Sequence, residues 1–269
     1  MYMKIRAAVN GYGNLGRGVV SALSLCSDME LVCVFTRRKP GDITGLSVPV
    51  VSASEAPEWA GRVDVCILCG GSATDLPQQG PEFARYFNTV DSFDTHARIP
   101  EYFAAMDAAL RASGHAGIIS VGWDPGLFSV NRVMSDAILP DGAAYTFWGR
   151  GVSQGHSDAI RRIPGVRRAV QYTVPVDAAV EAVRSGRCPE LSAREKHTRE
   201  CWVVLEDGAD AGAVRRAIVT MPHYFSDYDT TVRFIDEETF LREHTEMPHG
   251  GFVQRTGRSA DGHTHMIEY

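Results

Sequence analysis

The chain has 269 residues, of which 44% are hydrophobic and 22% are charged, and its formal net charge is −6. This composition is that of an ordinary globular protein with enough residues for one large domain or two modest ones. The negative charge gives no reason to expect a nucleic-acid partner, and no run of 18 or more apolar residues is present to span a membrane. No secretory leader precedes the first predicted strand, so we expect a cytoplasmic protein.

The first half of the chain alternates strand and helix patterns, which is typical of a parallel sheet with crossover helices. The predicted strands span 4–10, 29–36, 63–70, 88–93 and 116–122. The predicted helices span 14–26, 78–87 (beginning near Pro81) and 99–114, the last stopped by Gly114. We therefore predict an α/β fold with a Rossmann-type doubly wound sheet over residues 1–121.

The pattern changes after a turn and helix at 122–139. Strand-like segments at 143–150, 169–176, 200–207 and 229–236 are separated by helices and longer loops. This predicts a second, α+β domain over residues 122–269.

The cysteines are spread over the chain, and their spacing matches no common zinc pattern. Cys66 and Cys69 form a C-x-x-C pair inside a predicted buried strand, where residues three apart point to opposite faces. We predict core thiols there, not a redox or metal pair. The six cysteines are Cys26, Cys33, Cys66, Cys69, Cys188 and Cys201.

A G-x-G-x-x-G motif joins the first predicted strand to the first helix, which favours a dinucleotide site over a purely structural turn. Gly11 permits a tight turn, Gly13 lets the backbone approach a pyrophosphate, and Gly16 allows close packing of helix on strand. The N–H groups at the start of the helix are suited to an anion.

The end of the second strand distinguishes NAD from NADP. A carboxylate there would bind the ribose hydroxyls, but the chain has Thr36, Arg37 and Arg38, which suit a phosphate. We predict NADP(H) as the cofactor; the alternative is that these basic residues form only a solvated charge cluster.

The glycine-rich stretch Cys69–Asp75 follows another strand and is predicted either to approach the cofactor or to form a simple turn.

Carboxylates follow two neighbouring strands at their carboxyl ends. Asp91 and Asp94 end one strand, and Trp123 and Asp124 follow the next. Carboxylates in such a crevice can bind an ammonium group or move protons, although aspartate is also a common turn residue.

The second domain carries groups suited to a substrate carboxylate. The glycine-rich stretch 147–166 reads as a loop leading into a helix, Arg199 can form a bidentate pair with a carboxylate, and His249 lies between proline and glycine. The pair His263 and His265 has no evident third ligand, so we predict no metal.

These motifs together resemble the meso-diaminopimelate dehydrogenases, the NADP-dependent, dimeric oxidoreductases of bacterial lysine and peptidoglycan biosynthesis. The resemblance runs from the first strand to Tyr269. The matching stretches are GYGNLGR, FTRR, GSATD, VDSFD, GWDPG, FWG, SQGHSDAIRRIPGV, QYT and MPHGG.

The resemblance implies reversible oxidative deamination of the D-centre of meso-2,6-diaminopimelate, a homodimer, and a role for each matching residue. The implied catalytic residues are Asp94 and Asp124. The implied substrate-binding residues are Trp123, Trp148, Gln154, Gly155, Thr173, Arg199 and His249. The implied NADP-binding residues are Gly11, Tyr12, Gly13, Asn14, Leu15, Gly16, Thr36, Arg37, Arg38, Gly70, Gly71, Ser72, Ala73, Ser92, Phe93, Val121, Gly122 and Pro125.

One feature departs from the family pattern. Members of the family continue for several tens of residues beyond the stretch matching HTHMIEY, and an asparagine there helps to bind the L-centre. We therefore expect the second domain to be incomplete at its C-terminal end.

The alternatives to this function are an NADP-dependent oxidoreductase of another amino or oxo diacid, such as a dihydrodipicolinate reductase, and a non-catalytic NADPH-binding protein.

Overall fold

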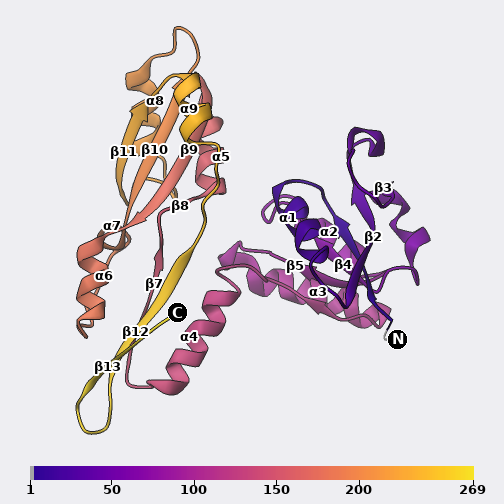
Figure 1. Cartoon of the computed structure of the whole chain (residues 1–269), viewed down its shortest axis with the longest axis horizontal. Helices are drawn as coiled ribbons and strands as arrows, with labels where there is room; N and C mark the ends of the chain where they lie inside the picture. The colour runs from indigo at the N-terminus through magenta and orange to yellow at the C-terminus, as the bar shows by residue number, and fades with distance from the viewer. Residues whose placement is uncertain (1–2) are drawn as a thin grey trace. The chain divides into compact units, whose positions relative to one another are not determined.

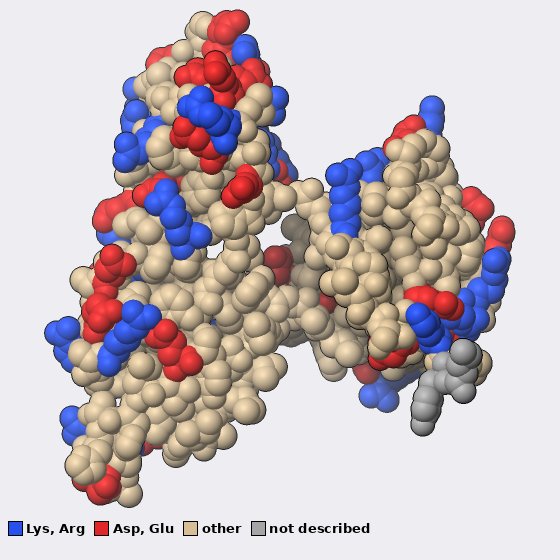
Figure 2. Space-filling model, in the orientation of Figure 1, with Lys and Arg blue, Asp and Glu red and all other residues tan. Residues whose placement is uncertain are grey.

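The computed structural model describes residues 3–269, and the chain divides into two compact units (Figure 1). Unit 1 ends at Ser129, and unit 2 comprises Val130–Tyr269. Within 3–269, no helix is long and apolar enough to cross a membrane. On the face shown in Figure 2, Lys and Arg side chains are interspersed with Asp and Glu side chains over unit 2.

Unit 1 is built on a six-stranded sheet in the order β3-β2-β1-β4-β5-β6, in which every pair is parallel. This is the Rossmann strand order, which confirms the predicted doubly wound sheet. The order reverses between β1 and β4, so the ligand crevice is expected at the carboxyl ends of these strands. The elements are β1 (Ile5–Asn10), α1 (Asn14–Leu23), β2 (Met29–Thr36), η1 (Pro40–Asp42), β3 (Val50–Ser52), η2 (Ala53–Trp59), β4 (Val65–Leu68), α2 (Leu76–Phe83), β5 (Asn88–Asp91), η3 (His96–Arg98), α3 (Ile99–Ser113) and β6 (Gly117–Ile118).

Several boundaries differ from the predicted ones, and two of them have a clear physical reason. Helix α2 begins at Leu76, not near Pro81, because Pro77 lies in its first turn, where a missing N–H costs no helical hydrogen bond. Strand β6 ends at Ile118 instead of continuing to 122, since Ser120 has a φ of 62° and turns the chain out of the extended conformation.

Helices cover both faces of this sheet, and each face has its own hydrophobic cluster. Cys66 belongs to the fully buried cluster that includes Phe35 and Phe83, whereas Cys69 packs against the cluster of Val9 and Val34. The two thiols therefore lie on opposite faces, as predicted. Cys69 is only partly buried, which corrects its assignment to the core, because it lies just beyond the last residue of β4.

Unit 2 has an α+β architecture with two sheets. The first has the order β11-β10-β9-β8, with β10 and β11 parallel and the other pairs antiparallel, and the second has the order β13-β12-β7 and is antiparallel. Helix α4 (Leu127–Ile138) begins in the last residues of unit 1 and continues into unit 2. The elements that follow it are β7 (Gly142–Trp148), β8 (Gly151–Val152), α5 (Gln154–Arg161), β9 (Val166–Pro175), α6 (Asp177–Arg184), α7 (Ala193–Lys196), β10 (His197–Leu205), α8 (Ala211–Val219), β11 (Asp229–Phe234), α9 (Glu237–Glu243), β12 (Gly251–Arg258) and β13 (Thr264–Glu268).

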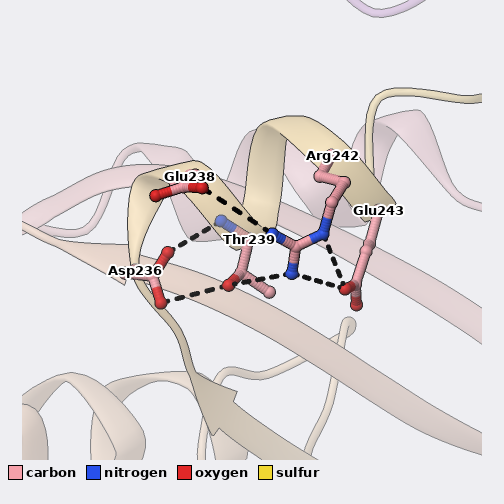
Figure 3. A network of polar contacts seen from close by, with 5 residues as sticks. All are labelled: Asp236, Glu238, Thr239, Arg242 and Glu243. Carbon is pink, nitrogen blue, oxygen red and sulfur yellow. Dashed lines mark hydrogen bonds and ion pairs between the residues drawn. The ribbon is translucent and has the colours of Figure 1, made fainter.

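The chain enters α9 directly from β11 through a polar network (Figure 3). The carboxylate of Asp236 accepts hydrogen bonds from the N–H of Thr239 at 2.7 Å and from its hydroxyl at 3.1 Å. This caps the helix and satisfies a donor that the first turn leaves without a helical partner. Arg242 pairs with Glu243 at 2.8 Å, and the cap orients α9 so that Phe240 is buried against the sheet.

Candidate active site

A cavity of about 610 Å³ lies at the carboxyl ends of β1, β2 and β4, where the strand order of unit 1 reverses. Eight of its lining residues are among those predicted for NADP: Gly11, Tyr12, Gly13, Thr36, Arg37, Arg38, Gly70 and Gly71. Asn14 and Leu15 begin α1, and Ser72 and Ala73 continue the loop after Gly71.

Glycine suits each of the three motif positions for a different structural reason. Gly11 has a φ of +99°, a conformation that favours glycine. A Cβ at Gly16 would lie 1.9 Å from the carbonyl oxygen of Gly11, so only glycine allows α1 to approach the turn. A Cβ at Gly13 would meet no atom of the described protein within 4 Å, which leaves the space beside its backbone open to the cavity.

Both arginines at the end of β2 are held by nearby groups. Arg38 donates from Nη2 to the carbonyl oxygen of Tyr12 at 2.7 Å, and its backbone N–H donates to the Thr36 hydroxyl at 3.1 Å. Arg37 forms an ion pair with Asp75 at 2.8 Å. Partial burial opposes ionisation of Asp75, but the N–H of Gly71 and the Arg37 guanidinium together lower its pKa.

Four lining residues were not among those named for NADP: Asn10, Cys69, Asp75 and Gln79. Cys69 and Asp75 nevertheless belong to the stretch that was predicted either to approach the cofactor or to form a turn. Asn10 and Cys69 immediately precede predicted glycines, so their positions at the strand ends carried a usable signal. Asp75 directly precedes α2 and Gln79 lies in its first turn, so both reach the cavity from the start of this helix, which was predicted to open near Pro81. Asn10 Nδ2 donates to Gln79 Oε1 at 3.1 Å, linking the two sides of this crevice.

Asp91 holds together the loops that follow β5 and β6. Its Oδ1 accepts from the backbone N–H of Phe93 at 3.0 Å and of Ser120 at 3.2 Å, and its Oδ2 accepts from the Tyr102 hydroxyl at 2.7 Å. The Val121 N–H donates to its carbonyl oxygen at 2.8 Å. Asp91 is 2% exposed, so it has a structural role and presents no carboxylate to a ligand.

Asp94 is exposed and lies next to the glycine-rich loop after β4. Its backbone N–H donates to the hydroxyl of Ser72 at 2.8 Å, which joins the loops that follow β4 and β5. Ser92 is half-buried just before it, whereas Phe93 is buried in the core with its ring stacked on Tyr102 at 4.2 Å. The loops after β4, β5 and β6 are therefore joined by hydrogen bonds.

Trp123, Asp124 and Pro125 lie in a tight turn that begins at Gly122. The Gly122 N–H donates to the carbonyl oxygen of Pro125 at 3.0 Å, and the bond between Asp124 and Pro125 is cis. Trp123 is 40% exposed and packs its ring against buried Phe128, with ring centroids 5.4 Å apart. Val121 precedes this turn and is also exposed.

A second cavity, of about 220 Å³, lies within unit 2 and brings together four predicted substrate residues: Trp148, Thr173, Arg199 and His249. Residues of three neighbouring strands meet here because of the register of the sheet. Gly151 of β8 pairs with Thr173 of β9, and Thr173 pairs with Arg199 of β10. The remaining lining residues are Gly149, Gly151, Val152, Ser153, His156 and Gly250. Gln154 and Gly155 do not line the cavity; they form the exposed first turn of α5, directly after Ser153.

Arg199 is the one arginine among the residues that line this cavity. Arg199 is 7% exposed. Its Nη1 donates to the Thr173 hydroxyl, and its guanidinium carbon lies 3.9 Å from the ring centroid of Tyr228. Its Nε is buried without a hydrogen-bond partner, and no acidic side chain of residues 3–269 pairs with it. Burial lowers the pKa of Arg199, while Tyr228 opposes that change. A buried cation without an anionic partner is costly, so this guanidinium is suited to an incoming carboxylate.

Neutral imidazoles surround the guanidinium. Burial and the charge of Arg199 lower the pKa of His156 to about 4, and the same causes together with Lys196 lower the pKa of His197 to about 4. The backbone N–H of Trp148 donates to His197 Nε2 at 2.9 Å, which requires that nitrogen to be unprotonated. The lining imidazole of His156 is therefore neutral near neutral pH and adds no charge beside Arg199.

His249 and Gln154 were predicted to contact substrate and are placed at the same end of unit 2. His249 Nδ1 donates to the carbonyl oxygen of Val152 at 3.1 Å, and its ring centroid lies 5.3 Å from that of Trp148. Gln154 Nε2 donates to Met247 Sδ at 2.8 Å. Across residues 3–269, no group of three or more His, Cys, Asp or Glu side chains is arranged to hold a metal ion.

Comparison with known proteins identifies the family. The model of the diaminopimelic acid dehydrogenase C-terminal domain matches residues 122–269. The meso-diaminopimelate D-dehydrogenase of Ureibacillus thermosphaericus is 62% identical over 267 residues, which cover 99% of this chain and 82% of that relative. The chain belongs to the meso-diaminopimelate dehydrogenase family. It is therefore an oxidoreductase, as the motifs predicted.

Solved structures of this family agree in fold. A six-substitution variant of the Clostridium tetani meso-diaminopimelate dehydrogenase, solved with DAP, has a TM-score of 0.92 and 48% identity. An engineered D-amino acid dehydrogenase bound to NADP+ has a TM-score of 0.86 and 45% identity. Each comparison covers 99% of this chain and 82% of the other.

Proposed function

We propose that this chain catalyses the NADP-dependent oxidative deamination of meso-2,6-diaminopimelate at its D-centre, giving L-2-amino-6-oxopimelate and ammonia, and the reverse reductive amination. In the cell this reaction would belong to lysine biosynthesis. The observation that carries the proposal is buried Arg199, which has no acidic partner in the described chain and faces a cavity sized for the end of a small molecule.

The cavity of unit 1 fits NADP. Gly13 leaves space beside its backbone for the pyrophosphate, and the start of α1 supplies N–H groups to it. Arg37 and Arg38 supply guanidinium groups at the end of β2, where an adenosine 2′-phosphate would lie. When bound, NADP+ accepts the hydride that leaves the D-centre carbon.

Asp94 and Asp124 are proposed to act at the D-centre. The D-centre nitrogen must be neutral before its carbon can lose hydride, because the nitrogen lone pair forms the new C=N bond. Water then hydrolyses this imine, which leaves the oxo group and releases ammonia. We assign Asp94 and Asp124 to bind the ammonium group, with one of them accepting its proton. Trp123 is proposed to contact the substrate beside them.

Thr173, Arg199 and His249 are proposed to hold the remote L-centre, with Arg199 pairing with its carboxylate. Binding the remote end determines which end of a nearly symmetric substrate meets the nicotinamide. The Clostridium tetani variant solved with DAP is substituted at five numbers where this chain has the replaced residue type: Q154L, T173I, R199M, P248S and H249N. Three of these residues, Thr173, Arg199 and His249, line this cavity, which supports it as the substrate site.

The test is the appearance of reduced nicotinamide absorbance with purified protein, NADP+ and meso-diaminopimelate, run beside NAD+ and beside the L,L isomer. We expect a signal with NADP+ and the meso isomer alone. Asp124→Asn should lower kcat by at least about 100-fold, the usual scale for a proton-transfer residue, with little effect on the KM for NADP+. Equal turnover of the L,L isomer would contradict the assigned stereochemistry.

We also propose that the protein is a homodimer. Five apolar side chains of α4 are each more than half exposed, which is unusual for one short helix and is typical of a surface that pairs with another protein. They are Leu127, Val130, Val133, Met134 and Ile138. Light scattering after size-exclusion chromatography should give twice the mass of the chain, and Val133→Glu should shift it to the monomer.

A further inference from the structure

Arg199 has a neighbour that no motif indicated. The guanidinium carbon lies 3.9 Å from the ring centroid of Tyr228, close enough for a strong cation–π contact. Thr173 contacts the same guanidinium through Nη1, so one hydroxyl and one aromatic ring are its main polar and π partners. Because Arg199 is buried, water contributes little to orienting its long side chain.

The position of Tyr228 follows from the sheet. Arg199 on β10 pairs in register with Thr230 on β11, and Tyr228 is the residue that precedes β11. A turn anchors it there: the Tyr228 N–H donates to the carbonyl oxygen of Phe225 at 3.0 Å, and Phe225 is fully buried. The fold therefore fixes the position of the Tyr228 ring, and this ring contacts the guanidinium of Arg199 and restrains it.

We propose that Tyr228 is a positioning residue for the substrate's remote carboxylate, acting by fixing the guanidinium of Arg199. This inference rests on the proposed function, which assigns that carboxylate to Arg199. A flat arginine group binds a carboxylate bidentately only when its plane is correctly oriented. The ring face limits rotation of that plane and partly offsets the cost of the buried charge, so that Arg199 is oriented before substrate arrives.

The test is a double-mutant cycle on the whole chain, measuring kcat/KM for meso-diaminopimelate with saturating NADP+. Tyr228→Leu should lower kcat/KM about tenfold, through KM and not kcat, and Tyr228→Phe should restore it to within about threefold of the parent. In an Arg199→Met background, Tyr228→Leu should have no further effect, because the group it positions is gone. The KM for NADP+ should not change in any variant.

Three outcomes would overturn the inference: an unchanged kcat/KM in Tyr228→Leu, a loss that Tyr228→Phe does not restore, or the same loss with and without Arg199, which would indicate general packing. Failure of Arg199→Met alone to raise the KM would instead overturn the proposed carboxylate site, and the inference with it. Circular dichroism melting checks each variant for folding. If Tyr228→Leu is unfolded, Tyr228→Met replaces it, since its unbranched side chain fills the same space without a ring.

Discussion

Acidification should destabilise the protein through His197. This imidazole is 7% exposed, and burial, Arg199 and Lys196 lower its pKa from the ordinary histidine value of about 6.5 to about 4. Its folded-state pKa is lowered, so the unfolded chain binds a proton more readily. The stability that this group contributes is therefore complete above about pH 6.5 and is lost as the pH falls toward 4. Linkage gives a loss of about 2 kcal/mol at about pH 5 relative to about pH 7.5.

The matched variant is His197→Gln, whose amide oxygen can still accept the hydrogen bond from the backbone N–H of Trp148 but does not titrate. Urea unfolding followed by tryptophan fluorescence, at several pH values between about 5 and 7.5, gives the free energy of unfolding of each protein. The variant should lose about 2 kcal/mol less than the parent over this interval. A control, His263→Gln, removes an imidazole whose side chain is 77% exposed and should keep the parent's pH dependence. Parallel curves for the parent and His197→Gln would refute the reasoning.

Three further results are expected. Arg37→Ala combined with Arg38→Ala should raise the Kd for NADPH at least about 30-fold but that for NADH less than about threefold, measured by nicotinamide fluorescence; equal losses would contradict the phosphate assignment. Gly16→Ala should abolish cofactor binding or lower the melting temperature by several degrees, because its Cβ would lie 1.9 Å from the carbonyl oxygen of the motif's first glycine. Tyr102→Phe removes a donor to the buried carboxylate of Asp91 and should cost about 1.5–3 kcal/mol in urea unfolding; an unchanged midpoint would show that this bond contributes nothing net.

Much of unit 1 was predictable because its signals are local. Alternating apolar strands, amphipathic helices and a glycine motif at a strand–helix junction identify a Rossmann sheet with the crevice at its carboxyl ends. Thr36, Arg37 and Arg38, which were predicted for the cofactor, all line the cavity at this edge, and their contact with NADP stays a prediction. The position of Asp91 in the sequence allowed either a ligand-binding role or a role in a turn. Its burial shows that its role is structural.

What could not be predicted depends on contacts between distant segments. Gln79 lines the cavity of unit 1 because α2 begins at Leu76, before the opening near Pro81 that the sequence suggested. Tyr228 meets Arg199 only because β11 pairs with β10 in a register that no sequence pattern specifies. The neutral state of His197 depends on burial within unit 2, which residue type alone does not reveal.

The hydrogen bonds around Asp91 have a consequence for ligand binding. Three separate chain segments share this one carboxylate and its carbonyl group, so the loops after β5 and β6 keep their spacing without any bound molecule. Loops already confined in this way lose little conformational entropy when a ligand arrives, and more of the contact energy remains as affinity. Asp91 thus favours ligand binding without contacting the ligand, because it orders these loops before the ligand arrives.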